Sequence, residues 1–276
     1  MISVLSAGSW ATVSAAPPSV GKYVALGDSY AAVGTLTTID PRVPGCARAA
    51  DNYPGDLARL LGAGQFVDVT CGQAVTADMF APQVTPVGVN PPQLDALTED
   101  TDLVTITVGG NDFGVGDLFA RCGALAVTDP TGAPCRDSLG LGGDQLAARA
   151  AYATANMRRV FDEIHRRAPH ATVVSVDYLR PLPPTGTCRW QLPVADGDAV
   201  FFNEMWDRYR VVASAEMAER GALFADVGAE LGHDACQPPG VRWVEPPIPA
   251  APYVAGHPNA AGQAYVAAYI ADLLRR

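Results

Sequence analysis

The chain has 276 residues, with 19 Lys and Arg against 29 Asp and Glu, so its formal net charge is −10. Nucleic acid is an unfavourable partner for such a chain, because binding a polyanion requires a basic stripe that releases counterions. The basic residues are scattered singly, except for four on one predicted helix, interpreted as a solvated face: Arg158, Arg159, Arg166 and Arg167. With 49% hydrophobic and 17% charged residues, the composition excludes a disordered protein and indicates a packed globular one.

The N-terminal residues are apolar and small, and Val13-Ser14-Ala15 resembles a signal-peptidase site. The basic residues that normally begin an export signal are missing. We therefore interpret residues 1–20 as the remnant of an export signal, with a disordered tail as the alternative. Since neither an internal repeat nor a linker divides the remainder, residues 21–276 are expected to form one domain. No other stretch approaches the ~20 uninterrupted apolar residues that a membrane-spanning helix needs.

Strand and helix patterns alternate along the chain. Short runs rich in β-branched residues predict strands at 23–26, 66–70, 103–108, 172–176 and 222–225. Apolar residues three or four positions apart predict helices at 52–61, 144–168, 199–220 and 259–275. This alternation predicts an α/β fold: a single-domain, three-layer α/β/α structure with a flavodoxin-like parallel sheet of five strands. Right-handed crossovers then place the C-terminal ends of all strands at one edge, where such folds hold their sites.

Four segments rich in Pro or Gly interrupt the alternation, at 35–51, 114–143, 179–198 and 228–256. Each contains cysteine, so we expect long loops that disulfides hold at the functional edge. The six cysteines include no Cys-x-x-Cys pair, which removes the spacing typical of structural zinc and of thioredoxin chemistry. An even, well-spread set favours an exported chain with disulfides. Sequence order favours the pairs Cys46–Cys71, Cys122–Cys135 and Cys188–Cys236, with free buried cysteines as the alternative.

A serine stands just beyond the first predicted strand, in Leu26-Gly27-Asp28-Ser29-Tyr30. The glycine allows a sharp turn, so Ser29 is presented where a nucleophile is useful, although a helix cap would look the same. A serine also needs a base to take its proton before it becomes a good nucleophile.

Two further segments bring hydrogen-bond donors to the same edge. The third strand ends in Gly109-Gly110-Asn111-Asp112, and an asparagine amide there is able to donate to a developing oxyanion. An Asx-turn that closes the loop is the structural alternative for Asn111. Gly72 follows the second strand, and its backbone N–H is expected to face the same space, although a plain turn glycine would look identical.

The candidate base is His257, in Gly256-His257-Pro258-Asn259 immediately before the last predicted helix. A proline and a helix N-cap fix its backbone, so its ring is able to lie over the strand edge. The other three histidines, His165, His170 and His233, are interpreted as solvent-facing.

Taken in chain order, Gly27-Asp28-Ser29, Gly72, Gly109-x-Asn111-Asp112 and His257-Pro258 resemble the four sequence blocks of the SGNH (GDSL-type) hydrolase family. The resemblance covers residues from about Lys22 to the C-terminus. Together with the six cysteines and proline-rich loops, the Gly-Asp-Ser-Tyr form is most similar to the secreted actinobacterial lipases, esterases and phospholipases of that family. The resemblance implies an extracellular serine hydrolase that cleaves small-molecule or lipid carboxylic esters through an acyl-enzyme, as a monomer without cofactor or metal.

The same resemblance assigns roles to individual residues. Ser29 would be the nucleophile and His257 the general base. The backbone N–H groups of Ser29 and Gly72, with the Asn111 side chain, would form the oxyanion hole.

One position departs from the family pattern. Most members carry Asp three residues before the histidine, where this chain has Val254. Some secreted actinobacterial relatives use a main-chain carbonyl there, so the Val254 carbonyl is expected to accept the proton of the second ring nitrogen. A neutral acceptor fixes the tautomer but stabilises the imidazolium less than a carboxylate does. Glu245 and Asp234, in the preceding loop, are the alternatives.

The sequence indicates less about the substrate than about the catalytic residues. Residues expected to line an acyl groove are Trp190, Phe201, Phe202, Trp206, Trp243, Ile248 and Tyr253, with core packing as the alternative for Phe202 and Trp206. A carbohydrate deacetylase, an arylesterase and a thioesterase would use the same constellation, and an inactive binding module would keep the fold. A nucleotide-binding protein is disfavoured because no Gly-x-Gly-x-x-Gly or phosphate loop occurs, and a metalloenzyme because no His-Glu-x-x-His occurs.

Overall fold

The computed structural model describes residues 20–43, 45–138, 144–248 and 252–276. The predicted N-terminal segment, residues 1–20, therefore lies almost entirely outside the described residues. Five parallel strands form the central sheet, in the order β2-β1-β5-β6-β7. The strands are β1 (Lys22–Gly27), β2 (Gln65–Asp68), β5 (Leu103–Thr107), β6 (Thr172–Val176) and β7 (Leu223–Ala225). The predicted parallel sheet of five strands is confirmed.

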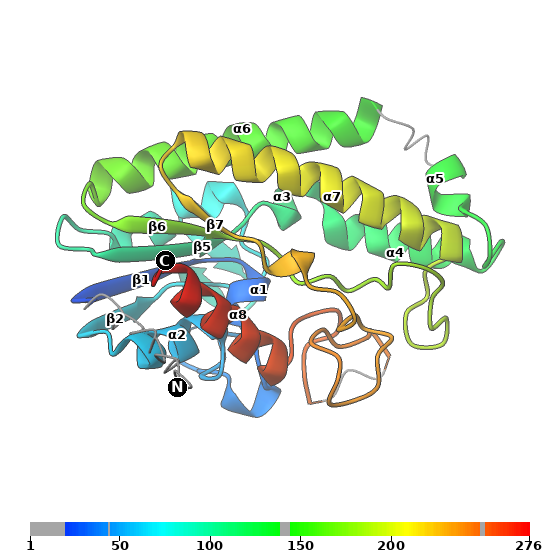
Figure 1. Ribbon diagram of the computed structural model, residues 1–276, viewed down its shortest axis with the longest axis horizontal. Helices are drawn as coiled ribbons and strands as arrows, with labels where there is room; N and C mark the ends of the chain where they lie inside the picture. Colours follow the sequence, from blue (N-terminus) through cyan, green and yellow to red (C-terminus); the bar gives the residue numbers. More distant parts are fainter. Residues whose placement is uncertain (1–19, 44, 139–143, 249–251) are drawn as a thin grey trace, which may run out of the picture.

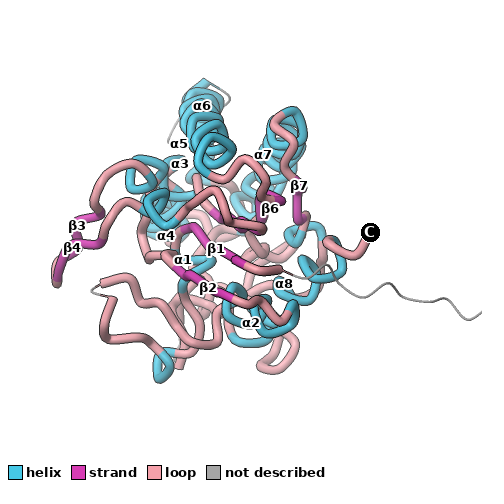
Figure 2. The backbone as a smooth tube through the Cα atoms, turned by 90° about the vertical axis from the view of Figure 1, so that its left-hand side faces the viewer, coloured by secondary structure: helices cyan, strands magenta, loops and turns pink. Residues whose placement is uncertain are grey.

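Helices cover both faces of this sheet, as predicted. Helices α2 (Tyr53–Leu61) and α8 (Ala260–Leu273) lie on one face, and α6 (Asp144–Arg167) and α7 (Asp196–Glu219) lie on the other (Figures 1 and 2). Side chains alternate between the faces of a strand. In β1, accordingly, Tyr23 and Ala25 join the core under α2 and α8, whereas Val24 and Leu26 join the core under α6.

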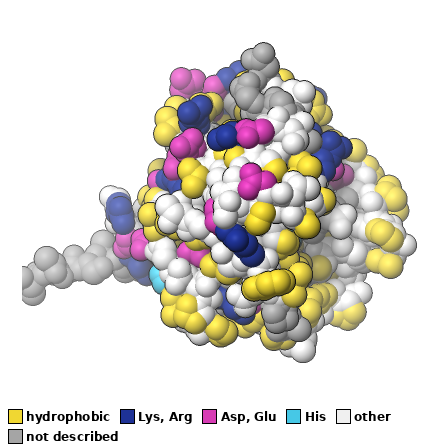
Figure 3. All heavy atoms as spheres, turned by 90° about the vertical axis from the view of Figure 1, so that its right-hand side faces the viewer, with side chains coloured by type: hydrophobic (Ala, Val, Ile, Leu, Met, Phe, Trp, Pro, Cys, Tyr) yellow, Lys and Arg dark blue, Asp and Glu magenta, His cyan; other side chains and the backbone are white. Residues whose placement is uncertain are grey.

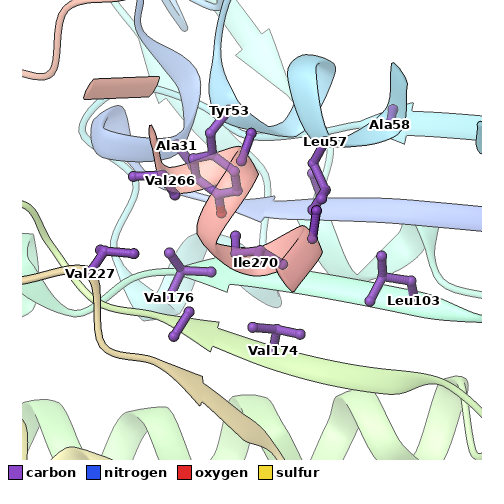
Figure 4. Packing of buried hydrophobic residues seen from close by; sticks show 14 of the residues in the cluster. Ala31, Tyr53, Leu57, Ala58, Leu103, Val174, Val176, Val227, Val266 and Ile270 are labelled. Carbon is purple, nitrogen blue, oxygen red and sulfur yellow. The ribbon is translucent and has the colours of Figure 1, made fainter. Parts of the chain in front are cut away.

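The core under α2 and α8 shows how the sequence pattern becomes packing (Figure 4). Tyr53 and Leu57 of α2 pack with Val266 and Ile270 of α8, and all four are buried against the strands. The Asn259 side chain begins α8 by accepting the Gly262 N–H, which satisfies a donor that the first helical turn leaves free. This cap fixes the point at which the chain enters α8, directly after His257.

The predicted loop 114–143 is wrong over most of its described residues, because these contain α4 (Val115–Ala126) and α5 (Pro134–Ser138). Two glycines, Gly116 and Gly123, conceal the helical pattern of α4, yet Leu118 and Cys122 form a buried face. In the other three predicted loops, most of the described residues lie outside helices and strands. Short elements that were not predicted are α1 (Ser29–Ala32), α3 (Gly110–Phe113), η1 (Leu36–Thr38), η2 (Thr76–Met79), η3 (Gln93–Ala96), η4 (Val227–Ala229) and the hairpin of β3 (Gln83–Thr85) with β4 (Gly88–Asn90).

All six cysteines form disulfides, in the predicted pairs Cys46–Cys71, Cys122–Cys135 and Cys188–Cys236. The first joins the long loop after α1 to the end of β2. The second joins α4 to α5. The third joins the loop after β6 to the loop after β7, so that two long irregular segments are held against each other.

Charges of both signs lie close together on one face of the molecule (Figure 3). On the face seen in Figure 3, Lys and Arg side chains are scattered and lie next to Asp and Glu. Among the described residues, ion pairs such as Arg189–Asp196 and Arg180–Asp207 join charges of opposite sign. Among the described helices, none combines the length and the apolar character needed to cross a membrane.

Candidate active site

Ser29 is placed by a turn that only glycine permits. Gly27 ends β1 with φ of +148°, and a Cβ atom there would lie 2.7 Å from the Thr107 carbonyl oxygen of the neighbouring strand. Asp28 then caps α1, since its side chain accepts the Tyr30 N–H at 2.9 Å. Ser29 is thus the first residue of a short helix at the C-terminal edge of the sheet. Its backbone N–H donates to no acceptor among the described residues.

His257 reaches Ser29 across 228 positions of sequence: its Nε2 lies 2.7 Å from the Ser29 Oγ. The other ring nitrogen, Nδ1, lies 2.7 Å from the carbonyl oxygen of Ala255. The predicted acceptor, the Val254 carbonyl, is therefore wrong by one residue. The Val254 carbonyl instead accepts the backbone N–H of His257 at 3.2 Å and so closes a turn. Gly256, with φ of +71°, lets the chain turn there and leaves the Ala255 carbonyl beside the ring.

Neither alternative carboxylate contacts the imidazole. Glu245 is buried, accepts the Asn259 side-chain N–H at 2.9 Å and pairs with Arg242 at 2.5 Å. Asp234 accepts the Cys236 backbone N–H at 3.0 Å. Over residues 20–43, 45–138, 144–248 and 252–276, the hydrogen bonds to the His257 ring come from Ser29 and Ala255 only. The ring is thus oriented by a neutral main-chain acceptor.

Burial lowers the pKa of His257 below its ordinary 6.5, and the hydrogen bond with the Ala255 carbonyl opposes this shift in part. Desolvation disfavours the charged imidazolium, which is the usual effect of burial on histidine. The ring is consequently neutral at neutral pH. A neutral ring whose Nδ1 proton is bound by Ala255 has a free lone pair on Nε2 for the Ser29 hydroxyl.

Asn111 lies in α3, just after β5, and borders the same cavity as Ser29 and His257. Its side-chain nitrogen donates one hydrogen to the Ala74 carbonyl at 2.9 Å, which leaves the second hydrogen for another acceptor. Asp112 accepts the Thr76 backbone N–H at 2.9 Å. These two bonds fix the loop after β2 against the end of β5.

Gly72 does not present the free N–H that the sequence suggested. Its backbone N–H donates to the Cys46 carbonyl at 2.8 Å, a partner brought close by the Cys46–Cys71 disulfide. The next residue, Gln73, adopts a left-handed backbone with φ of +65°, and its N–H has no acceptor among the described residues. The unoccupied donor of this loop is thus one position beyond the glycine.

Two tyrosines that sequence reasoning missed hold the site together. The Tyr178 hydroxyl donates to the Asp28 Oδ2 at 2.5 Å and accepts the Gly110 N–H at 2.9 Å. It therefore ties the chain just after β1, β5 and β6. Burial raises the pKa of Asp28 to about 7, against the opposing effect of this hydrogen bond. The sequence does contain a signal for Tyr178, because it is a polar aromatic residue two positions after a predicted strand.

The second tyrosine, Tyr30, secures the histidine loop. Its hydroxyl donates to the Gly256 carbonyl at 2.9 Å, and its ring centroid lies 5.2 Å from that of His257. Through this contact the helix that begins with Ser29 also holds the turn that carries His257.

A cavity of about 260 Å³ opens beside Ser29, Asn111 and His257. Its remaining walls are mostly apolar, with Val115, Phe119, Pro181, Leu192, Trp206, Ala235 and Pro247 among them. Mostly apolar walls with a few convergent polar groups are typical of small-molecule sites.

Of the seven residues predicted to line an acyl groove, only Trp206 lines this cavity. Trp190 is 93% exposed and Phe202 is only 4% exposed, in the core. Trp243 stacks between His233 and Tyr265, at ring distances of 3.6 and 3.9 Å. The remaining three, absent from its walls, are Phe201, Ile248 and Tyr253.

Comparison with known proteins agrees with this geometry. The model of the GDSL-like Lipase/Acylhydrolase family matches residues 25–265. Lipase 2 of Streptomyces coelicolor is 37% identical over 272 residues, which cover 96% of this chain and 90% of that protein. The crystal structure of phospholipase A1 from Streptomyces albidoflavus superposes with a TM-score of 0.71 at 27% identity, covering 93% of this chain and 100% of that one.

A second solved structure, the extracellular lipase from Streptomyces rimosus, gives a TM-score of 0.67 at 28% identity, with 91% and 99% of the two chains covered. In all these comparisons the similarity extends over nearly the whole length of both chains. The chain belongs to the GDSL-like lipase/acylhydrolase family.

Proposed function

We propose that this protein is a serine hydrolase that cleaves carboxylic esters through an acyl-enzyme. The observation that carries the proposal is the 2.7 Å contact between the Ser29 Oγ and His257 Nε2, in a ring whose other nitrogen is bound by a carbonyl. A nucleophile, a base within hydrogen-bond reach and a group that orients the base are the parts that acyl transfer needs.

The reaction follows from these positions. His257 Nε2 takes the hydroxyl proton while the Ser29 Oγ attacks the ester carbonyl carbon, and the imidazolium then gives that proton to the departing alkoxide. The acyl group remains on Ser29. A water molecule, deprotonated by His257 in turn, releases the acid and restores the serine.

The developing oxyanion would be bound by the Ser29 N–H, the second Asn111 amide hydrogen and the Gln73 N–H. Gln73 replaces Gly72 in this assignment because the Gly72 N–H is already bonded to Cys46. One donor of this kind typically lowers the barrier by about 3 kcal/mol, or more than a hundredfold in rate.

The apolar walls of the cavity support an ester with an acyl chain as substrate, in agreement with the relatives named lipase and phospholipase A1. Three disulfides favour an oxidising compartment, and one similar structure is named an extracellular lipase. We therefore assign the protein to the extracellular space, where it would act as a monomer.

The decisive experiment is labelling by a fluorophosphonate probe, which forms a covalent bond with an activated serine. The native chain and a Ser138→Ala variant, whose serine is exposed at the end of α5, should label equally fast. Ser29→Ala should not label and should lose ester turnover. Labelling that persists in Ser29→Ala would refute the assignment of the nucleophile.

A further inference from the structure

The active-site cavity ends at a wall beyond which the interior continues. A second, much smaller void of about 20 Å³ lies next to it. Four residues border both spaces, and we call them the acyl wall: Val115, Phe119, Pro181 and Trp206. These four residues therefore lie between the cavity that holds Ser29 and the second space.

The acyl wall is supported from behind. The Phe119 ring of α4 stacks on Phe202 of α7, with centroids 5.8 Å apart and planes at 15°. Phe202 is buried, so it has little room to yield. The Trp206 ring meets Tyr178 edge-on at 5.8 Å, and its buried Nε1 has no hydrogen-bond partner among the described residues. Packing rather than hydrogen bonding therefore holds these two rings in place.

A larger space lies on the far side of the small void. Phe113 and Met205, which border the void, also border a groove of about 570 Å³ between α6 and α7. Active-site cavity, small void and groove consequently follow one another, each sharing residues with the next. Removing one ring from the acyl wall would lengthen the space available to a chain attached to Ser29.

We propose that the acyl wall sets the longest acyl chain that the enzyme accepts, and that Phe119 is the residue that determines this limit. The inference rests on the proposed ester hydrolysis at Ser29. Each methylene buried in the cavity is worth about 0.8 kcal/mol, or about fourfold in kcat/KM. Once the chain reaches the wall this gain stops, because a further methylene must stay in water or displace Phe119 from Phe202.

Phe119 is the better test position of the two rings. Trp206 touches Tyr178, which is bonded to Asp28 and Gly110, so its replacement would disturb the groups around Ser29. Phe119 touches no hydrogen bond of that network. Its replacement by Ala enlarges the cavity toward the void, and its replacement by Trp shortens it. A general loss of stability would instead lower turnover at every chain length.

The test measures kcat/KM for p-nitrophenyl esters from acetate to palmitate, each below its micelle concentration. For the native chain we expect a rise of about fourfold per methylene that ends at a defined length. Phe119→Ala should move this end point to longer chains by about two methylenes or more, the milder Phe119→Leu should move it in the same direction, and Phe119→Trp should move it to shorter chains. Phe201→Ala, the same change at a groove residue outside the wall, should leave the end point where it is.

An end point that stays fixed in the Phe119 variants, or that Phe201→Ala moves equally, would overturn the inference, as would a native profile without an end point. Acetate hydrolysis separates this failure from failure of the proposed function. If acetate turnover depends on Ser29 while the end point does not move, only the role of the wall is wrong. If Ser29→Ala still hydrolyses acetate, the proposed function itself is wrong.

Discussion

The two halves of the site are built in different ways. Ser29, Asn111 and Tyr178 each follow a strand of the central sheet by two to four residues, so the sheet itself spaces them. The acyl half comes from α4, α7 and the long segments after β6 and β7, which a disulfide joins. Apart from His257, which a turn in the segment after β7 carries, the chemical groups thus depend on regular backbone, whereas substrate fit depends on loops and packed rings. Changes in the first half should alter kcat, and changes in the second should alter selectivity.

The largest expected effect is at His257. Replacement by Ala removes the only base that contacts Ser29 in the described residues, and kcat for a short ester should fall by on the order of 10⁴–10⁶-fold. The melting temperature should change by only a few degrees. His170→Ala, the same change at an exposed position, should keep native kcat, and equal loss in both variants would contradict the assignment.

Asn111→Ala should lower kcat by about 10²–10³-fold with little change in KM, because one oxyanion donor acts mainly in the transition state. Steady-state kinetics on acetate and butyrate esters measure this split. A variant that raised KM and spared kcat would place Asn111 in substrate binding and remove it from the oxyanion hole.

Tyr178→Phe should have a smaller effect, a fall of about tenfold in kcat. The variant leaves the Gly110 N–H and one Asp28 oxygen without their shared partner, an unsatisfied pair that costs about 1–3 kcal/mol. KM for short esters should stay near the native value. Tyr152→Phe, at an exposed tyrosine, is the matched control, and an equal fall there would show that the Tyr178 hydrogen bonds are irrelevant to turnover.

The double variant Cys188→Ser with Cys236→Ser tests the acyl half of the site, which is built partly from loops. Loss of this disulfide, which spans 48 positions, should lower the free energy of unfolding by about 2–4 kcal/mol. Leu192 and Ala235, close to the two cysteines, line the cavity. KM for long-chain esters should therefore rise about fivefold, while kcat for acetate changes less than about threefold. A large fall in acetate kcat would mean that the two halves are not separable.

The smallest expected effect is the dependence of kcat/KM on pH. Turnover requires neutral His257, so kcat/KM should fall as pH drops through the pKa of this residue, which burial places below 6.5. The acid limb of the profile should have its midpoint below 6.5. A midpoint near 7 would instead point to Asp28, whose pKa burial raises to about 7. Asp28→Asn distinguishes the two, since it should leave a limb that belongs to His257 unchanged.

The sheet and the residues at its edge could be predicted because short-range rules govern them. A glycine–serine turn after a buried strand has few conformations, and parallel strands bring their ends together, so Ser29 and Asn111 were predictable. His257 followed from its place before a capped helix. The pairing of the cysteines in sequence order was correct for the same reason: neighbouring loops meet at one edge.

Details of individual carbonyl and N–H groups could not be predicted. Which carbonyl reaches the imidazole depends on the turn at Gly256. The acceptor is therefore the Ala255 carbonyl and not the predicted Val254 carbonyl. Which N–H is free depends on a disulfide that brings Cys46 against Gly72. The free donor is therefore the N–H of Gln73 and not the predicted N–H of Gly72. The cavity walls depend on how α4 packs against α7. Aromatic content alone did not reveal that packing, and most of the predicted aromatic lining was therefore wrong.

The carbonyl that orients His257 has an evolutionary consequence. An acidic third member of a triad is lost by one codon change, whereas a peptide oxygen is present whatever amino acid occupies position 255. Selection then acts on the path of the chain, and the vulnerable site is Gly256, whose φ of +71° most other residues rarely adopt. Substitutions at position 255 should therefore leave catalysis unchanged. The residue whose replacement should disturb the orientation of His257 is its neighbour Gly256.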